Sequence, residues 1–128
     1  MSVSALDINL PTGENTLHIL WTTGELNSVK NMVFMYAGNS LRHQWWNNVH
    51  IIVWGAATEL LVRDAGVQEE LHAFIKLGGT VSVCRRCAEN LGALDSVKAM
   101  EAWGNLKVYY VGETFTKLIK AGEKIISI

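Results

Sequence analysis

Apolar residues along the chain gather in five short runs. The runs cover residues 17–21, 50–54, 80–83, 106–111 and 124–128. Gly24, Gly55 and Gly112 stand just after three of them. Short, continuous apolar runs that end at glycine are typical of strands that are buried on both faces. The pattern therefore predicts five strands.

Between these runs, apolar residues recur at the spacing of a helix. The longest such segment begins at Asn27 or Ser28 as the expected N-cap and continues to about His43. The other expected helices cover residues 58–63, 67–77, 88–91, 96–103 (with Asp95 as a candidate N-cap) and 114–120. Alternation of strand and helix is typical of a mostly parallel sheet that right-handed crossovers cover on both faces. We therefore expect a three-layer α/β/α sandwich with a mostly parallel five-stranded sheet.

The domain organisation is expected to be simple. Residues 1–15 are polar and contain Pro11 and Gly13, so we expect a flexible N-terminal arm there. Residues 16–128 are expected to form a single domain, because a chain of 128 residues falls within the usual range for one core.

The charge balance narrows the classes of partner. The chain has 11 basic and 12 acidic residues and a formal net charge of −1, so no basic surface is expected for a nucleic acid or an anionic membrane. Residues 1–11 do not resemble a signal peptide, and no run of about 18 apolar residues could span a bilayer. We expect a cytoplasmic protein with neither nucleic acid nor membrane as a partner.

The candidate chemistry lies in the dithiol Cys84-Arg85-Arg86-Cys87, directly after the third expected strand. A cysteine at the start of a helix lies near free backbone N–H groups, which favour the thiolate. Arg85 and Arg86 are expected to stabilise that anion further, and such sites have depressed cysteine pKa values. Cys87, one helical turn on, could resolve a mixed disulfide that Cys84 forms.

Other interpretations of the dithiol are open. Both residues could be core cysteines, since free cysteine is often buried. A zinc site would need two further ligands, but there is no second cysteine pair and the four histidines are scattered, so we expect no metal. A thioredoxin fold is rejected, because the dithiol follows the third strand and Pro11 is the only proline.

A weaker ligand site is expected in the loops after the first two strands, since ligands of such sheets bind beyond the carboxyl ends of the strands. Thr22, Thr23 and Gly24 could bind an anion at the start of the long helix, with Gly55 in the neighbouring loop. The alternative is a simple turn.

An oligomer interface is also expected from the apolar residues. Phe34 and Met35 fall outside the apolar stripe of the long helix, and Trp45 and Trp46 follow it, which is more apolar surface than a small monomer usually exposes. His43 and His50 flank the tryptophan pair, and we expect surface or capping roles for both.

From about residue 16 to 128, the chain resembles the DsrE/DsrF-like family, which includes sulfur-relay subunits and YchN-like proteins. The resemblance rests on residues 21–24, 51–55, 83–84 with Gly92 downstream, 111–113 and the terminal strand. It implies a flavodoxin-like layered fold, a homotrimer or homohexamer, and a persulfide-carrying cysteine at the position of Cys84. Cys87 has no counterpart in the single-cysteine relay subunits, so a branch with two cysteines is the nearer relative.

These observations lead to one main hypothesis and two alternatives. In the main hypothesis, Cys84 accepts sulfane sulfur as a persulfide and passes it to a partner protein, with Cys87 assisting release and no cofactor involved. One alternative is an oligomeric small-ligand-binding or scaffold protein in which the cysteines are incidental. The other is a dithiol/disulfide oxidoreductase that uses Cys84 and Cys87. Whether the protein is a catalyst stays open.

Overall fold

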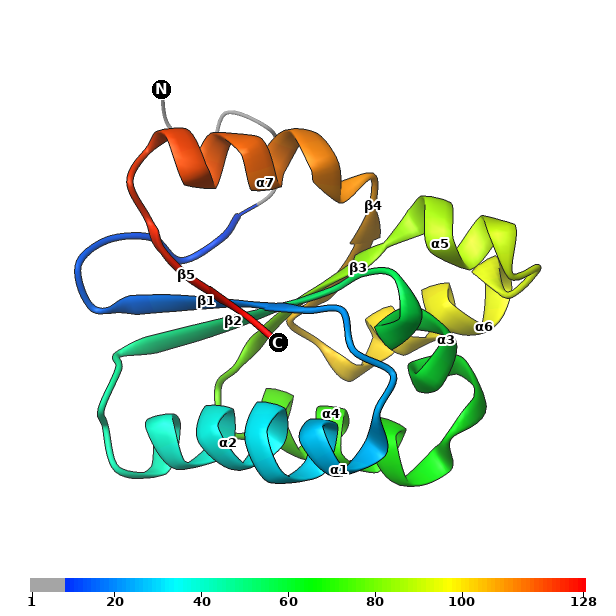
Figure 1. The fold of residues 1–128 in the computed structure, drawn as a ribbon, viewed down its shortest axis with the longest axis horizontal. Helices are drawn as coiled ribbons and strands as arrows, with labels where there is room; N and C mark the ends of the chain where they lie inside the picture. Colours follow the sequence, from blue (N-terminus) through cyan, green and yellow to red (C-terminus); the bar gives the residue numbers. More distant parts are fainter. Residues whose placement is uncertain (1–8) are drawn as a thin grey trace.

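Five parallel strands form one sheet in the order β4-β3-β2-β1-β5. The structure, a computed structural model, describes residues 9–128. The strands are β1 (Thr16–Trp21), β2 (Asn48–Val53), β3 (Thr80–Cys84), β4 (Leu106–Tyr109) and β5 (Lys124–Ser127). The predicted three-layer α/β/α fold is confirmed, and the sheet is parallel throughout (Figure 1).

Helical segments connect all the strands. They are α1 (Leu26–Ser28), the π-helix η2 (Val29–Phe34), α2 (Met35–Arg42), α3 (Ala56–Arg63), α4 (Ala65–Lys76), α5 (Arg85–Asn90), α6 (Leu94–Ala99), the 3₁₀ helix η3 (Met100–Trp103) and α7 (Val111–Lys120). Within residues 9–128, no helix is long and apolar enough to cross a membrane.

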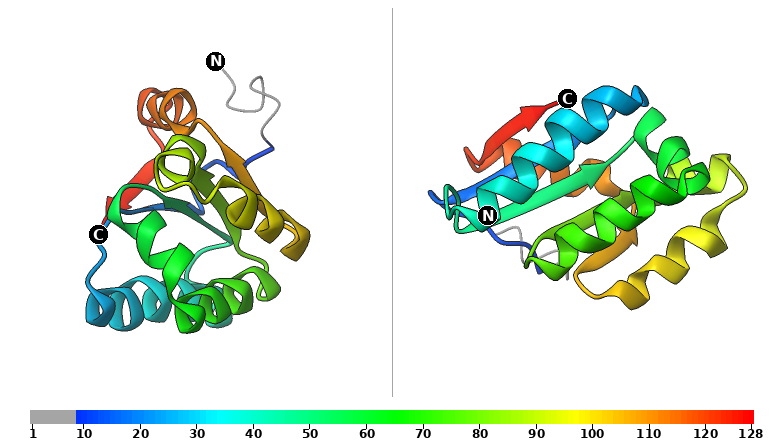
Figure 2. Two further views of the ribbon diagram at one scale, coloured as in Figure 1. Left: turned by 90° about the vertical axis from the view of Figure 1, so that its right-hand side faces the viewer. Right: turned by 90° about the horizontal axis from the view of Figure 1, so that it is seen from below.

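The helices are shared unequally between the two faces of the sheet. Strands β1 to β4 are added side by side in one direction, whereas β5 returns to the far edge next to β1. Right-handed crossovers place the helices between β1 and β4 on one face and α7 on the other. Figure 1 shows α2 and α4 below the sheet and α7 above it, and Figure 2 shows the same arrangement from two other sides.

Two apolar clusters follow from this division. The larger contains Ile19, Ile51 and Val83 from the strands, packed against the helices below the sheet. The smaller, which we call the α7 core, consists of buried Ile52, Cys84, Val111 and Leu118, with Leu10, Leu20, Trp54, Cys87, Tyr109, Phe115 and Ile125 packed against them. Alternate residues of each strand therefore serve different cores, because successive side chains point to opposite faces.

The long first helix differs from its prediction at its start and in its middle. Glu25, not Asn27 or Ser28, is the N-cap, since its carboxylate accepts the N–H groups of Asn27 (2.8 Å) and Ser28 (3.0 Å). The π-helical turn shifts the face that packs on the sheet, because it holds more residues per turn than an α-helix. Phe34, expected outside the apolar stripe, is therefore buried, and Met35 is 51% exposed.

The other element boundaries shift by a few residues. Val111, expected to end a strand, begins α7, and Arg85 already belongs to α5. Ala93, not Asp95, precedes α6 as its N-cap. Of the expected arm, residues 1–8 lie outside the described residues, whereas Leu10 packs on the α7 core and the Gly13 N–H donates to the Glu123 carboxylate at 3.1 Å.

Candidate functional site

The carboxyl ends of β3 and β4 form the point at which the chain switches faces. The connection after β3 packs into the larger core through Ala88 and Val97, whereas α7, which follows β4, covers the opposite face. In open α/β sheets, ligands bind in the crevice that such a switch creates. Cys84 is the last residue of β3 and is paired in register with Tyr109 of β4, so the dithiol lies at this switch point.

Cys84 performs a structural task there as the N-cap of α5. Its extended backbone (φ −64°, ψ 112°) turns the sulfur over the first helical turn, where Sγ accepts the N–H of Cys87 at 3.3 Å. Cys84 is 3% exposed and Cys87 is half-buried, and both are free thiols. The expected position at a helix start, with Cys87 one turn on, is therefore observed.

The electrostatics of Cys84 oppose the expected depressed pKa. Burial against the α7 core raises the pKa of the Cys84 thiol to about 11, and the adjacent Cys87 thiol acts in the same direction. The N–H groups of Cys87 and Arg86 favour the thiolate but do not offset the loss of hydration. Cys84 is therefore a protonated thiol at neutral pH, and its chemistry needs a group that takes the proton.

Arg85 and Arg86, expected to stabilise the thiolate, are directed at other partners. Their Nε atoms lie 3.2 Å and 3.7 Å from the two carboxylate oxygens of Glu89. Both guanidinium groups also lie over the ring of Tyr110, at 5.6 Å and 5.8 Å from its centroid, and the Tyr110 hydroxyl donates to Glu89 at 2.9 Å. The geometry assigns the two arginines to a surface cluster with Glu89 and Tyr110 rather than to the thiol.

The α7 core closes over the dithiol. Trp54, which follows β2, meets Phe115 of α7 edge-to-face with ring centroids 5.7 Å apart. A side chain on Gly112 would come within 3.9 Å of the Trp54 ring, so the start of α7 lies close to the end of β2. Cys84 therefore sits beneath an aromatic and aliphatic cover, which accounts for its burial.

The weaker ligand site expected in the first two loops has its N–H groups already occupied. The C-terminal Ile128 carbonyl accepts the N–H groups of Thr22 (2.8 Å) and Thr23 (3.2 Å), and Glu25 caps the helix that follows. An added anion would meet the Glu25 carboxylate there, so the structure favours the simple turn at Thr22, Thr23 and Gly24. Gly55 lies beside this turn with φ +65°, which explains why glycine is needed.

A buried chain of polar side chains, which the sequence analysis missed, crosses the α7 face of the sheet. Glu123 Oε1 lies 2.9 Å from His18 Nε2, and His18 Nδ1 lies 2.8 Å from His50 Nδ1. His50 Nε2 lies 2.7 Å from Ser82 Oγ, which lies 2.7 Å from the Tyr109 hydroxyl. We call these five residues the polar chain. His18, His50 and Ser82 are all fully buried.

The expected surface role of His50 is therefore wrong. Burial lowers the pKa of His50 to about 3, and burial also lowers the pKa of His18 despite the opposing effect of the Glu123 carboxylate. Both imidazoles are neutral at neutral pH. The signal in the sequence was a histidine near the start of each of the first two apolar runs. In the structure, each histidine holds the third position of its strand, so parallel pairing of β1 with β2 brings them opposite each other.

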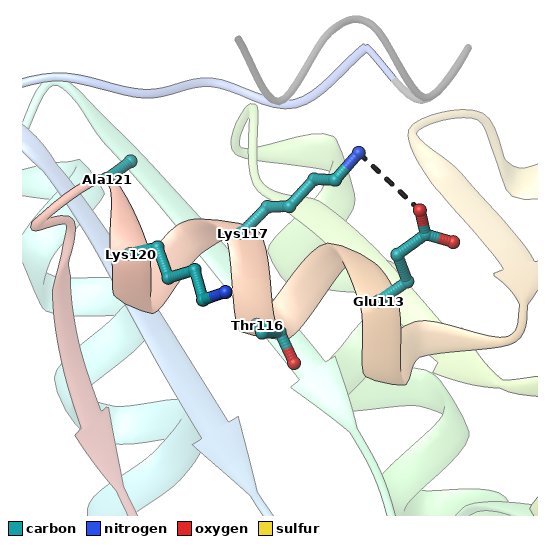
Figure 3. Close-up of a pocket in the computed structure, with 5 residues that line it drawn as sticks. All are labelled: Glu113, Thr116, Lys117, Lys120 and Ala121. Atoms are coloured by element: carbon teal, nitrogen blue, oxygen red, sulfur yellow. Dashed lines mark ion pairs between the residues drawn. The ribbon is translucent and has the colours of Figure 1, made fainter. Parts of the chain in front are cut away.

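A surface hollow lies along α7. It has a volume of about 410 Å³ and is lined by Glu113, Thr116, Lys117, Lys120 and Ala121 of the α7 end of the chain. Figure 3 shows the Glu113–Lys117 ion pair (3.5 Å) beside it. Elsewhere in the described range 9–128, no group of three or more His, Cys, Asp or Glu residues could hold a metal ion.

Comparison with known proteins identifies a relative. No family model matches the sequence, and no curated protein matches it. A similar solved structure is that of a conserved protein of unknown function, BT1422, from Bacteroides thetaiotaomicron, with a TM-score of 0.83 and 38% sequence identity. The alignment covers 94% of this chain and 100% of that one. The chain therefore belongs to the same family as this Bacteroides protein.

Proposed function

We propose that the protein handles sulfur through Cys84, which accepts a sulfane sulfur atom as a persulfide and passes it to an acceptor thiol. The observation that carries the proposal is the placement of a free Cys84 thiol at the switch point of the sheet, with Cys87 one turn further along α5. The likeness of residues 16–128 to the DsrE/DsrF-like family supports the same chemistry. A persulfide at Cys84 would be shielded from bulk solvent by the α7 core.

The transfer conserves atoms and electrons. The Cys84 thiolate attacks the terminal sulfur of a donor persulfide, the S–S bond of the donor breaks, and the donor leaves as a thiolate that takes up a proton. An acceptor thiolate then attacks the outer sulfur of the Cys84 persulfide and restores the Cys84 thiol. In the alternative release, Cys87 attacks the inner sulfur, so the outer atom leaves as hydrosulfide and the two cysteines are oxidised to a disulfide.

The surface of the chain supports a homo-oligomer as the working form, in which a trimer or hexamer is expected. Met35 on α2 is 51% exposed and Trp45 is 56% exposed, and Met32 and Leu77 are also exposed apolar residues. Exposed apolar side chains of this kind are typical of association surfaces. The partners of sulfur transfer would be a donor and an acceptor protein, in the cytoplasm.

Intact mass spectrometry after incubation with inorganic polysulfide tests the proposal. We expect the wild-type chain to gain the mass of one sulfur atom, the Cys87→Ser chain to gain it and keep it longer, and the Cys84→Ser chain to gain none. Equal gains in the two single variants would contradict the role of Cys84. No gain in any chain would favour the ligand-binding scaffold.

A dithiol/disulfide oxidoreductase is the second candidate. The two free thiols interact with each other across one turn of α5, in the Cys-x-x-Cys spacing that redox dithiols use. This candidate predicts the loss of two hydrogen atoms from the wild-type chain on mild oxidation, with no dependence on sulfane sulfur and no reaction in either single variant.

A further inference from the structure

A second hollow, which we call the α2/α4 groove, lies on the face of the sheet opposite α7. It has a volume of about 360 Å³ and forms between η2–α2 and α4, two neighbouring helices that Figure 2 shows from below. Phe34 and Met35 line it from one side, and Phe74 and Leu77 line it from the other. Met35 is 51% exposed and Leu77 is 40% exposed. Exposed apolar side chains around a groove are typical of an interaction surface.

Charged side chains stand at different heights along this groove. The strands are all parallel, and each of the two helices returns the chain from the carboxyl end of one strand to the amino end of the next, so the helices run in the same direction. Arg42 is the last residue of α2, whereas Glu70 lies in the middle of α4. Both line the groove. The guanidinium group is therefore nearer to the amino ends of the strands than the carboxylate is.

The Glu70 carboxylate lacks a partner of its own. Its Oε2 atom is buried, and no group among residues 9–128 forms a hydrogen bond with it. Lys30 and Arg42 line the same groove, but within the described range neither forms an ion pair. Arg42 instead covers Gly38 and donates to Asn39 Oδ1 at 3.4 Å. A buried carboxylate oxygen without a donor is costly, so a donor from outside the chain would stabilise it.

The arrangement of the charges makes the groove complementary to itself. A two-fold rotation about an axis that crosses the groove between Glu70 and Arg42 exchanges their positions. Two chains related in this way bring Glu70 of each chain toward Arg42 of the other, with the apolar side chains of both grooves between the two ion pairs. A two-fold contact between identical chains uses the same surface on both of them. A second copy of this chain therefore matches both the charges and the apolar surface.

We propose that the α2/α4 groove is a two-fold interface between copies of this chain, in which Glu70 of each chain pairs with Arg42 of the other. The proposal rests on the homo-oligomer of the proposed function and names the surface that builds it. It needs no sulfur chemistry, because Phe34 and Phe74 belong to the larger core whereas Cys84 belongs to the α7 core. In the interface, the guanidinium group supplies the donor that the Glu70 carboxylate lacks.

Charge reversal followed by analytical ultracentrifugation tests the interface. In a pair of identical chains, Glu70→Arg places arginine against arginine, and Arg42→Glu places glutamate against glutamate. We expect each variant alone to have a dissociation constant roughly tenfold or more above that of the wild type. The assembled mass should then be halved, whether the two-fold contact makes a dimer or joins two trimers.

An equal mixture of the two variants gives a sharper readout. In a mixed pair, one chain carries arginine at both positions and the other carries glutamate at both, so both contacts are attractive again. We expect the mixture to regain the wild-type assembly. Recovery on mixing identifies a contact between chains, because a second chain cannot restore an ion pair within the first. A mixture that stays dissociated would overturn the interface.

Glu69→Arg is the matched control, because Glu69 is the exposed neighbour of Glu70 on α4 and does not line the groove. It should assemble like the wild type. Glu70→Gln keeps the size of the side chain and removes its charge, so it replaces Glu70→Arg if circular dichroism shows that the arginine variant does not fold. It should also weaken assembly, and unchanged assembly of Glu70→Gln would overturn the interface.

The outcomes separate this inference from the proposed function. Charge-reversal variants that assemble as well as the wild type would overturn this interface and leave the homo-oligomer in place. A wild-type chain that sediments as a monomer at every concentration would overturn both the interface and the homo-oligomer. Neither result changes the test of sulfur transfer at Cys84, which measures the mass of the added sulfur.

Discussion

The Nδ1 atoms of His18 and His50 lie 2.8 Å apart, with both rings completely buried between the sheet and its α7 cover. One ring must donate and the other must accept, so a proton added to either ring changes the whole hydrogen-bond pattern. The pair therefore holds two neutral histidines in the middle of a small domain. Its consequences can be measured even without a substrate.

The first consequence is a loss of stability in acid. His50 has a pKa near 3 in the folded chain against 6.5 in the unfolded chain, so between these values only the unfolded chain binds the proton. The free energy of unfolding should reach its plateau above pH 6.5. Below that pH it should fall by about 1.4 kcal/mol per pH unit, until the pKa of His50 in the folded chain is reached. The lowered pKa of His18 acts in the same direction. Urea unfolding at a series of pH values measures this slope.

His50→Gln should have a lower stability at neutral pH and a smaller dependence on pH. His43→Gln is the matched control, because His43 is exposed and stacks only on Trp45. Equal slopes for the wild-type and His50→Gln chains would show that His50 is not the group responsible.

The second consequence concerns the thiol. Because burial raises the pKa of Cys84 to about 11, NMR titration of its Cβ resonance should show a midpoint well above the ordinary value of 9.0. The equilibrium thiolate is then scarce at neutral pH, and any rapid reaction of Cys84 there requires a proton acceptor. A midpoint below 9.0 would contradict the raised pKa and support the depressed cysteine pKa that the sequence analysis expects.

Removing the arginine charges should leave this midpoint unchanged. Arg85→Ala and Arg86→Ala delete groups that bind Glu89 and cover Tyr110 at the surface, so each should change the stability little, since exposed ion pairs are screened by solvent. The same NMR titration checks the pKa, with Glu89→Gln as the variant that disrupts the cluster from its acidic side. A clear rise of the Cys84 midpoint in the arginine variants would mean that their charge does reach the thiol.

A pair of glycine substitutions tests the packing on the two faces of the sheet. A side chain at Gly79 would collide with the ring of Phe74, so Gly79→Ala should destabilise the fold by about 1–3 kcal/mol. Gly112→Ala places the new methyl group 3.9 Å from Trp54 and should leave stability unchanged or raise it by up to about 1 kcal/mol. Thermal unfolding of both variants measures these changes in stability. A Gly79→Ala chain as stable as the wild type would contradict the close packing of Phe74 on Gly79.

The fold was largely predictable because periodicity is local. The apolar runs and their glycine stops lie within a few residues of the observed ends of β1 to β5. The π-helical turn at Val29–Phe34 was not predictable from spacing, and it is the reason why Phe34 enters the core. Likewise, Glu25 is the N-cap because its longer side chain reaches the N–H groups of Asn27 and Ser28. The general preference for Asn or Ser as N-cap does not predict this contact.

The position of the site was also predictable, but its electrostatics were not. That Cys84 starts a helix follows from the order of strand and helix. The raised pKa depends on α7, whose Val111 and Leu118 come from the far end of the chain. The pairing of His18 with His50 and Glu123 depends on strand order in the same way, because these residues meet only when β1 lies between β2 and β5.

The most direct test of the central claim is to locate the added sulfur in the wild-type protein. Trypsin cleaves after Arg85 and Arg86, so Cys84 and Cys87 fall on separate peptides, residues 77–85 and 87–98. After brief exposure to polysulfide and alkylation of free thiols and persulfides, mass spectrometry of these peptides shows which sulfur was extended. We predict an alkylated persulfide on peptide 77–85. A persulfide confined to peptide 87–98, or none on either peptide, would contradict the assignment of Cys84 as the sulfur carrier.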